Sequence, residues 1–255
     1  MADIHTLAQR LDDAARSAKA IAQLSSSVRL TMEDAYAIQR ASIQRRIARG
    51  ERQVGIKMGF TSRAKMIQMG LSDMIWGRLT DGMLIEDGGV VPFNRYVHPR
   101  VEPEVAFLLK SKLVGTVTPL QALGCVEAIA PAIELIDSRY ENFKFSLEDV
   151  VADNSSSSGF VTGGWHKPDF DFTNLGIVLS FNGAAVQVGS TAAILANPLR
   201  SLVAAARFAA QADEPLQPGW IVMAGGATAA EALRPGTWVE CEIQQLGRTG
   251  FTIRT

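Results

Sequence analysis

The stretch Arg100-Val101-Glu102-Pro103-Glu104-Val105-Ala106-Phe107-Leu108-Leu109 decides what fold this chain can form. Its second half is apolar enough to be a strand that is buried on both faces. Because residues i and i+2 of a strand point to the same face, Glu102 and Glu104 are expected to project side by side. Pro103 cannot donate a hydrogen bond to a sheet ladder, so it predicts an edge or a bulge. Two buried carboxylates at this place repel each other and need a compensating cation.

A third glutamate stands alone in a second apolar run, from Ala130 to Ile136, at position 134. Three carboxylates in apolar strands predict a divalent metal site for Mg²⁺, Mn²⁺ or Ca²⁺, and the lack of histidine or cysteine nearby disfavours zinc. An octahedral Mg²⁺ held by three protein ligands keeps three positions for water or for a 2-oxo acid. The alternative is that each glutamate pairs with an arginine. The spacing leaves both interpretations open; the available arginines are Arg95, Arg100 and Arg139.

From Leu84 onward the chain is rich in expected strands and contains few helices. Asn182-Gly183 between two alternating runs predicts a two-residue hairpin. Helices are expected at 119–128 and 198–212. This pattern predicts an α+β fold with a mixed, mostly antiparallel sandwich or roll. The expected strands are 89–92, 101–109, 132–136, 175–181, 185–189, 220–224 and 237–243.

The first 50 residues are expected to form helices. Apolar residues from Leu7 to Ile21 recur at helical spacing, and Thr31 with Asp34 resembles a capping box that opens a second helix. A strand is expected at 54–60, followed by a short helix that begins at Thr61-Ser62 and ends near Gly70. We therefore predict a mainly helical N-terminal region at 1–75 and a β-roll catalytic domain at 76–255.

Composition excludes several classes of function. The 25 Lys and Arg residues nearly balance the 26 Asp and Glu residues, so no net field favours nucleic acid or an anionic membrane. No apolar stretch reaches the roughly 20 residues that a membrane-spanning helix needs, and the N-terminus lacks the apolar core of a signal peptide. Cys125 and Cys241 have no paired spacing and are expected to be reduced. These features predict a soluble, cytoplasmic protein.

Lys57 is the second candidate site residue, since it lies in an apolar strand between Gly55 and Gly59. A buried lysine keeps its charge only beside carboxylates or an anionic ligand, so it is expected to bind a substrate carboxylate or to transfer a proton. The alternative, equally open, is a surface lysine whose stem covers an edge strand. The segment 152–159 is either a flexible loop or an ordered polar loop. A GxSxG motif is absent, and Gly225-Gly226-Ala227-Thr228 matches no nucleotide-binding pattern.

Several ordered motifs together resemble one known family. They are Gly-x-Lys-x-Gly at 55–59, Gly-Arg-Leu-Thr-Asp at 77–81, Pro-Arg-Val-Glu-Pro-Glu at 99–104, Pro-Ala-Ile-Glu-Leu-Ile-Asp-Ser-Arg at 131–139, Val-Ala-Asp-Asn-Ser at 151–155 and Met-Ala-Gly-Gly-Ala-Thr-Ala-Ala at 223–230. The chain is similar to the 2-keto-4-pentenoate hydratase and 4-oxalocrotonate decarboxylase family, within the fumarylacetoacetate hydrolase superfamily. The resemblance covers nearly the whole chain. It implies a small helical N-terminal region followed by a mixed β-roll of the fumarylacetoacetate hydrolase C-terminal type.

The resemblance also implies roles for individual residues. Glu102, Glu104 and Glu134 match the family's metal ligands, for Mg²⁺ with Mn²⁺ as a substitute and without an organic cofactor. Lys57 matches the active-site lysine, with a catalytic and a substrate-binding role. The remaining matches are Asp81 as a catalytic residue and Ser156 and Thr228 as substrate-binding residues.

Three segments look closer to the decarboxylase branch of the family than to the hydratase branch: 57–66, 77–83 and 143–147. The implied reaction is the Mg²⁺-dependent decarboxylation of 2-oxo-3-hexenedioate to 2-hydroxy-2,4-pentadienoate and CO₂, in the meta-cleavage of catechols. The alternatives are a 2-hydroxy-2,4-pentadienoate hydratase, or a non-catalytic partner subunit of that pair. The resemblance further implies a homo-oligomer and a complex with the pathway hydratase.

Overall fold

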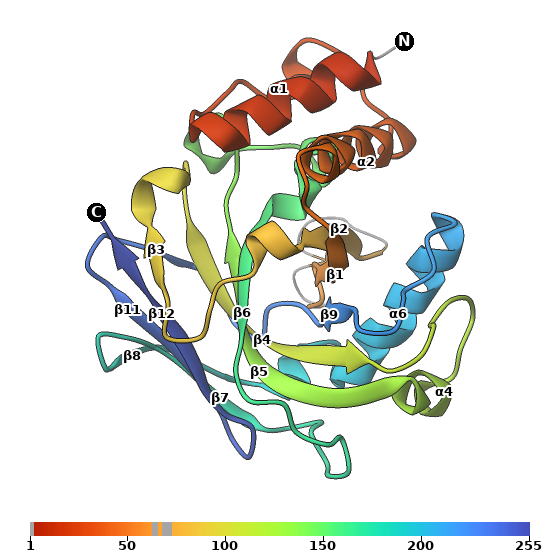
Figure 1. The fold of residues 1–255 in the computed structure, drawn as a ribbon, viewed down its shortest axis with the longest axis vertical. Helices are drawn as coiled ribbons and strands as arrows, with labels where there is room; N and C mark the ends of the chain where they lie inside the picture. Colours follow the sequence, from red (N-terminus) through yellow and green to blue (C-terminus); the bar gives the residue numbers. More distant parts are fainter. Residues whose placement is uncertain (1–2, 63–65, 68–72) are drawn as a thin grey trace.

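Two β-sheets that pack against each other form the body of the molecule, and two helices lie at one end of it (Figure 1). This computed structural model describes residues 3–62, 66–67 and 73–255. The helices at the top of Figure 1 are α1 (Ile4–Ser17) and α2 (Met32–Ala48). The predicted α+β fold, a small helical region followed by a curled mixed sheet, is therefore confirmed.

The larger sheet carries the strands that the sequence marks as important. Its order is β2 (Ile75–Thr80), β1 (Gln53–Gly59), β9 (Ile221–Met223), β4 (Arg100–Leu109), β5 (Val126–Ile136) and β6 (Ser157–Thr162), with β10 (Glu231–Ala232) beside β4. The smaller sheet has the order β3 (Val90–Pro92), β12 (Gly247–Arg254), β11 (Trp238–Ile243), β7 (Gly176–Phe181) and β8 (Ala184–Ser190). Pairs β1–β9 and β3–β12 are parallel, and the other ladders are antiparallel.

The central strands of the larger sheet are covered on both faces. Phe107 of β4 and Ile133 of β5 belong to the same apolar cluster as Leu179 and Phe251 of the smaller sheet. Helix α6 (Pro198–Gln211) joins that cluster through buried side chains such as Leu202. On the opposite face, Ala106 and Ala132 belong to a second apolar cluster, which includes Ile43 of α2. This double covering explains why the sequence of β4 and β5 is apolar almost without interruption.

Short helices connect these elements. They are α4 (Pro119–Gly124) and α5 (Leu147–Ala152), with single 3₁₀ turns η1 (Leu24–Ser26), η2 (Asp81–Met83), η3 (Phe93–Arg95), η4 (Glu141–Phe143), η5 (Asn154–Ser156) and η6 (Thr191–Ala193). The hairpin predicted at Asn182-Gly183 joins β7 to β8, and both turn residues have positive φ, as a type I′ turn requires.

The capping box predicted for α2 is present. The Thr31 side chain accepts a hydrogen bond from the Asp34 amide, and the Asp34 carboxylate accepts one from the Thr31 amide. We expect Thr31→Ala to lower the free energy of unfolding by about 1 kcal/mol, because the Asp34 amide at the helix start loses its ordered partner. Urea denaturation measures this change. Thr31→Ser keeps the hydroxyl and is the matched control; equal losses in both variants would contradict the capping role.

Several sequence predictions need correction. Ile21 is not helical, because α1 ends at Ser17 and the Ile21 amide donates to the carbonyl of Arg139 instead. The helix expected at 119–128 ends at Gly124, and the following residues begin β5. Strands β2, β6 and β12 were not predicted. The helix expected at 61–70 lies largely outside the described residues; Met66 and Ile67 are helical, and the Met66 amide donates to the Ser62 carbonyl.

The prediction that Pro103 marks an edge strand or a bulge is also wrong, since it lies at neither. It pairs in regular register with Ile133 of β5. On its other side β4 pairs with β10 only at residues 100–101 and with β9 only at residues 106–108. The Pro103 carbonyl faces that gap and accepts from the Ala227 amide. The proline nitrogen lies on the same side, where no ladder partner needs a donor, so a proline fits within a central strand.

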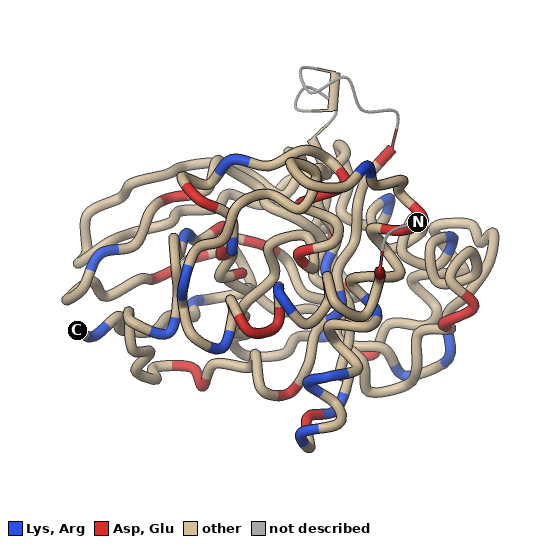
Figure 2. Tube along the Cα trace, turned by 90° about the horizontal axis from the view of Figure 1, so that it is seen from above, with Lys and Arg blue, Asp and Glu red and all other residues tan. Residues whose placement is uncertain are grey.

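The predicted division at residue 75 stays a prediction. Strand β1, on the N-terminal side of that boundary, is hydrogen-bonded to β2 and β9 and so belongs to the larger sheet. Acidic and basic residues are interspersed along the chain in Figure 2, as the near-zero net charge leads one to expect. Among the described residues, no helix is long and apolar enough to cross a membrane.

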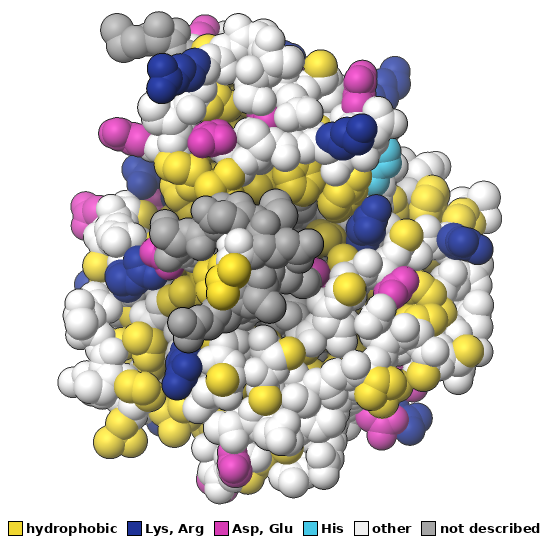
Figure 3. Space-filling model, turned by 180° about the vertical axis from the view of Figure 1, so that it is seen from behind, with side chains coloured by type: hydrophobic (Ala, Val, Ile, Leu, Met, Phe, Trp, Pro, Cys, Tyr) yellow, Lys and Arg dark blue, Asp and Glu magenta, His cyan; other side chains and the backbone are white. Residues whose placement is uncertain are grey.

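An apolar groove runs below the N-terminal helices, between α2 and the end of α6, with a volume of about 850 Å³ (Figure 3). Its floor contains Trp76, which stacks on Tyr36 at 5.5 Å and lies under the Arg78 guanidinium at 4.4 Å. None of the candidate site residues lines this groove. The chemistry that the sequence predicts therefore lies elsewhere.

Candidate metal centre and adjoining cavity

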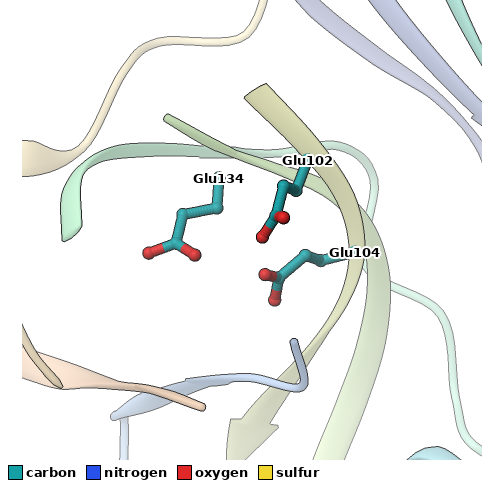
Figure 4. A group of neighbouring side chains, drawn as sticks. All are labelled: Glu102, Glu104 and Glu134. Atoms are coloured by element: carbon teal, nitrogen blue, oxygen red, sulfur yellow. The ribbon is translucent and has the colours of Figure 1, made fainter. Parts of the chain in front are cut away.

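The three glutamates predicted as metal ligands converge on one point (Figure 4). Glu102 and Glu134 are direct partners in the antiparallel register of β4 and β5, and Glu104 follows two residues along the same face of β4. One carboxylate oxygen from each lies within 4.8 Å of the others. Glu104 and Glu134 are fully buried, and Glu102 is half-buried. The strand register thus builds a cluster from residues 30 positions apart in the sequence.

The protein alone does not satisfy this cluster. Glu104 Oε2 accepts a hydrogen bond from the Gly225 amide at 2.7 Å, and Glu134 Oε2 lies 3.0 Å from Lys57 Nζ. Within the described part of the chain, Glu104 Oε1 and Glu134 Oε1 have no hydrogen-bond partner. Burial raises the pKa of Glu104 well above its ordinary value, and repulsion from Glu134 raises it further. Burial also raises the pKa of Glu134, which Lys57 offsets only in part.

Arginines do not compensate these carboxylates. Arg139 forms its ion pair with Asp153, and Arg100 lies over the ring of Phe143. Among the described residues Arg95 has no ion pair. The alternative interpretation of the glutamates as arginine ion pairs is therefore wrong.

A divalent cation fits what is present. Three carboxylates and one ammonium leave two negative charges in a buried space, and a divalent ion cancels them. Buried oxygen atoms without partners, aimed at one point, are the ligands that Mg²⁺ or Mn²⁺ prefers. No histidine or cysteine belongs to this cluster of described residues, which disfavours zinc.

Lys57 lies inside the protein and not on its surface. Only 3% of the residue is exposed, so the alternative of a surface lysine is wrong. Its ammonium donates to the Ser155 carbonyl at 3.0 Å and pairs with Glu134. Burial alone lowers the pKa of Lys57, but the three glutamates outweigh burial and raise that pKa above its ordinary value. Lys57 is therefore a fixed, charged group at the edge of the glutamate cluster.

The serine-rich segment is an ordered, buried loop. Asn154, Ser155 and Ser156 all have positive φ, an uncommon conformation for residues with side chains. Asn154 holds the loop in place, since its side-chain amide exchanges two hydrogen bonds with the backbone of Arg78 in β2. Gly77 permits this approach, because a Cβ there would lie 2.5 Å from the Asn154 carbonyl oxygen. The loop thereby presents the Ser155 carbonyl to Lys57.

A second loop closes the cluster from the other side. The Gly225 amide donates to Glu104, and Gly226 lies against Glu102, where a Cβ would be 2.7 Å from Oε2. Only glycine fits at position 226 without moving that carboxylate. The Gly-Gly turn after β9 therefore shapes the glutamate cluster; it is not a nucleotide-binding loop.

A cavity of about 340 Å³ adjoins the cluster. Its polar wall contains Lys57, Glu102 and Ser156. Its other walls are mostly apolar, with side chains from β2, β5, α5, the 141–145 segment and the residue after β1: Phe60, Ile75, Ile136, Phe143, Phe145 and Val150. The structure thus brings the glutamate cluster, Lys57 and Ser156 to one place.

Two predicted site residues are not brought there. Asp81 follows β2 at η2, where its carboxylate accepts from the amide and the guanidinium of Arg52. It does not line the cavity. Thr228 belongs to a segment whose neighbours Gly226 and Ala229 line the cavity, but the Thr228 methyl lies against Gly189 of β8.

Sequence reasoning missed several cavity residues. Phe60, Phe143 and Phe145 lie in segments that resemble the decarboxylase branch, but the resemblance assigned no role to these three residues. Arg100 did have a local signal: it lies two residues before Glu102 in the same strand, so the alternation that pairs the glutamates also places Arg100 on their face.

The chain is similar to known proteins over nearly its whole length. Residues 55–254 match the fumarylacetoacetate (FAA) hydrolase C-terminal family. The chain belongs to this family. It is 61% identical over 249 residues to a 4-oxalocrotonate decarboxylase of a Pseudomonas species, covering 98% of this chain and 97% of that protein. A 2-keto-4-pentenoate hydratase of Paraburkholderia xenovorans strain LB400 is 35% identical over 250 residues, covering 96% and 93%.

A solved structure of this family has nearly the same fold. It is the 4-oxalocrotonate decarboxylase from Pseudomonas putida G7 complexed with magnesium and adipate, with a TM-score of 0.95 and 37% identity over 98% of this chain and 97% of that one. The match covers 98% of this chain, so the β-roll and its helical end are those of this family.

Proposed function

We propose that this protein catalyses the Mg²⁺-dependent decarboxylation of 2-oxo-3-hexenedioate to 2-hydroxy-2,4-pentadienoate and CO₂. The observation that carries the proposal is the buried, uncompensated glutamate cluster with Lys57 at the end of a largely apolar cavity. Relatives of 61% and 41% identity that are named 4-oxalocrotonate decarboxylase support the reaction type.

Glu102, Glu104 and Glu134 would hold the ion, Mg²⁺ with Mn²⁺ as a substitute. When bound, the ion supplies Lewis-acid stabilisation of the negative charge that reaches the keto oxygen as CO₂ leaves. Lys57 lies beside Glu134 with its ammonium fixed by the Ser155 carbonyl. We assign it the binding of the 2-oxo acid end of the substrate and the transfer of a proton to the enolate oxygen.

The apolar walls have a separate effect. Phe60, Phe143 and Phe145 surround the substrate chain with side chains that neither donate nor accept hydrogen bonds. Excluding water from around this chain strengthens the electrostatic effect of the ion and of Lys57 on the charge that develops at the keto oxygen. Ser156, which lines the polar wall, is assigned to substrate binding.

The same cavity disfavours the hydratase alternative. Addition of water at C4 needs a base or a positioned water near that carbon. Among the described residues that line the cavity, Glu102 is the one carboxylate and there is no imidazole. The hydratase relatives are also more distant, at 35% identity against 61%. Self-association, a complex with the pathway hydratase, a place in catechol meta-cleavage and a cytoplasmic location stay predictions.

The direct test is an assay with freshly prepared 2-oxo-3-hexenedioate and Mg²⁺, with CO₂ release and ultraviolet absorbance followed together. We expect CO₂ release that EDTA abolishes and that added Mg²⁺ restores. Consumption of 2-hydroxy-2,4-pentadienoate without CO₂ release would establish the hydratase instead. Inactivity with both compounds would support the non-catalytic partner subunit.

A further inference from the structure

We propose that Arg100 forms a binding site for the distal carboxylate of the substrate and so selects six-carbon 2-oxo dicarboxylates over 2-oxo monocarboxylates. This inference rests on the proposed function, because it takes the glutamate cluster and Lys57 as the site of the 2-oxo acid end. It assigns a binding partner to the second end of the substrate, for which neither the glutamates nor Lys57 provides one.

The position of Arg100 matches the length of such a substrate. Arg100, Glu102 and Glu104 lie on the same face of β4, and Arg100 lines the same cavity as Glu102 and Lys57. Two residues of a strand advance by about 7 Å. The terminal carbons of an extended six-carbon diacid are about 6 Å apart, from five C–C bonds of about 1.5 Å. A substrate that lies along β4 from the glutamates therefore brings its far carboxylate to Arg100.

The guanidinium of Arg100 has its edge available. Its carbon lies 4.4 Å from the centre of the Phe143 ring, which covers one face of the group. Within the described part of the chain, Arg100 makes no ion pair and its side chain donates no hydrogen bond. Arg100 is half-buried, whereas the buried arginines of the described chain are paired: Arg78 with Glu214 and Arg139 with Asp153. A guanidinium stacked on its face keeps its in-plane N–H groups for a carboxylate, which they can bind in a bidentate manner.

Phe143 is itself held in place. Asn142 and Phe143 both have positive φ, so the turn adopts an uncommon conformation at two successive residues. The ring packs against Phe145 at 5.5 Å and makes a T-shaped contact with His98 at 6.2 Å between ring centres. This packing fixes the stacking surface of Arg100 before a ligand binds, which reduces the entropy that binding must cost.

The charge distribution along the cavity supports the same orientation. A divalent ion neutralises the glutamate cluster and receives the 2-oxo acid end, whereas Arg100 is a cation without a counter-ion among the described residues. A dicarboxylate is therefore oriented along β4, while a monocarboxylate of equal length leaves Arg100 unpaired. An arginine held in this way also fixes the direction of the carboxylate that leaves.

The experiment compares two unreactive ligands by titration calorimetry with Mg²⁺ present. 2-Oxoadipate has both ends of the substrate without its double bond, and 2-oxohexanoate has the same chain length without the distal carboxylate. We expect the wild-type protein to bind 2-oxoadipate about 10- to 100-fold more tightly, as a charged hydrogen-bonded pair contributes. In Arg100→Met that preference should vanish while the dissociation constant of 2-oxohexanoate stays unchanged.

Two further variants keep the result interpretable. Arg100→Lys retains the charge without the planar donors and should recover part of the preference. Arg95→Met removes a nearby cation that lines a different cavity and should leave both affinities unchanged. A preference that persists in Arg100→Met, or an equal weakening of both ligands, overturns the assignment.

The outcome also separates this inference from the proposed function. Wild-type protein that binds both ligands equally, in a manner that requires Mg²⁺, lacks the Arg100 subsite but keeps the 2-oxo acid site. Wild-type protein that binds neither ligand in an Mg²⁺-dependent manner contradicts the proposed function, and the subsite with it.

Discussion

Glu104→Gln is expected to lower Mg²⁺-dependent turnover by about 10³-fold or more while leaving the fold intact. Glu104 is fully buried, and one of its two oxygens has no hydrogen-bond partner in the described chain. Glutamine has nearly the same shape, and its carbonyl can still accept from the Gly225 amide. The change removes one negative charge from the cluster, so the site no longer balances a divalent ion. Glu102→Gln and Glu134→Gln should lose activity for the same reason.

Glu104→Gln is expected to lower turnover but to raise the stability of the metal-free protein. Without metal, Glu104→Gln should be more stable than the wild type by about 1–2 kcal/mol, because one uncompensated buried charge is gone. The wild type should gain thermal stability when Mg²⁺ is added, and the variant should not. Differential scanning calorimetry with EDTA and with Mg²⁺ measures both effects. Glu127→Gln, an exposed glutamate of β5, is the matched control; an Mg²⁺-induced gain in Glu104→Gln equal to that of the wild type would disprove metal binding by Glu104.

The sequence predicted the glutamate cluster because one simple rule covers most of it. Alternation along a strand places Glu102 and Glu104 on one face, whatever else the chain does. The partnership of Glu102 with Glu134 depends on the register between β4 and β5, which no local pattern specifies. The resemblance to a family supplied that link, and the observed register agrees with it.

The conformation of the loops in the site could not be predicted from local sequence patterns. Asn154, Ser155 and Ser156 adopt positive φ because Asn154 bonds to the backbone of Arg78 in a distant strand. Strand β6 begins at Ser157, and its serine-rich start has little strand propensity of its own; pairing with β5 makes it a strand. A pattern confined to the segment cannot show either effect.

Arg100 shows a different kind of failure. The sequence placed it on the right face but offered it only as an ion-pair partner for the glutamates. Whether Arg100 pairs with the glutamates or stays available for a ligand depends on Phe143, which is 43 residues away in the sequence and stacks on the guanidinium. For Asp81 the motif at 77–81 is present, but its carboxylate pairs with Arg52 and does not line the cavity; its catalytic role stays a prediction.

Lys57→Met is expected to lower kcat by about 10²- to 10⁴-fold, the range for loss of a group that moves a proton in the transition state. Methionine fills the same space without a charge, so the Ser155 carbonyl loses its donor and Glu134 loses its nearest cation. In the absence of metal we expect the free energy of unfolding to fall by about 3–5 kcal/mol, because a buried pair is broken on one side only. Added Mg²⁺ should restore much of that stability, since the ion compensates the same carboxylates.

These opposite effects separate Lys57 from the metal ligands. Glu104→Gln should lose both Mg²⁺ binding and turnover, whereas Lys57→Met should keep Mg²⁺ binding and lose turnover. Calorimetric titration with Mg²⁺ beside steady-state kinetics measures the difference, and Lys110→Met, an exposed lysine just beyond β4, is the control. If Lys57→Met loses Mg²⁺ binding in parallel with kcat, Lys57 acts by holding Glu134 in place. If it binds Mg²⁺ normally and turns over at the wild-type rate, Lys57 has no part in the reaction, and proton transfer must be assigned to water.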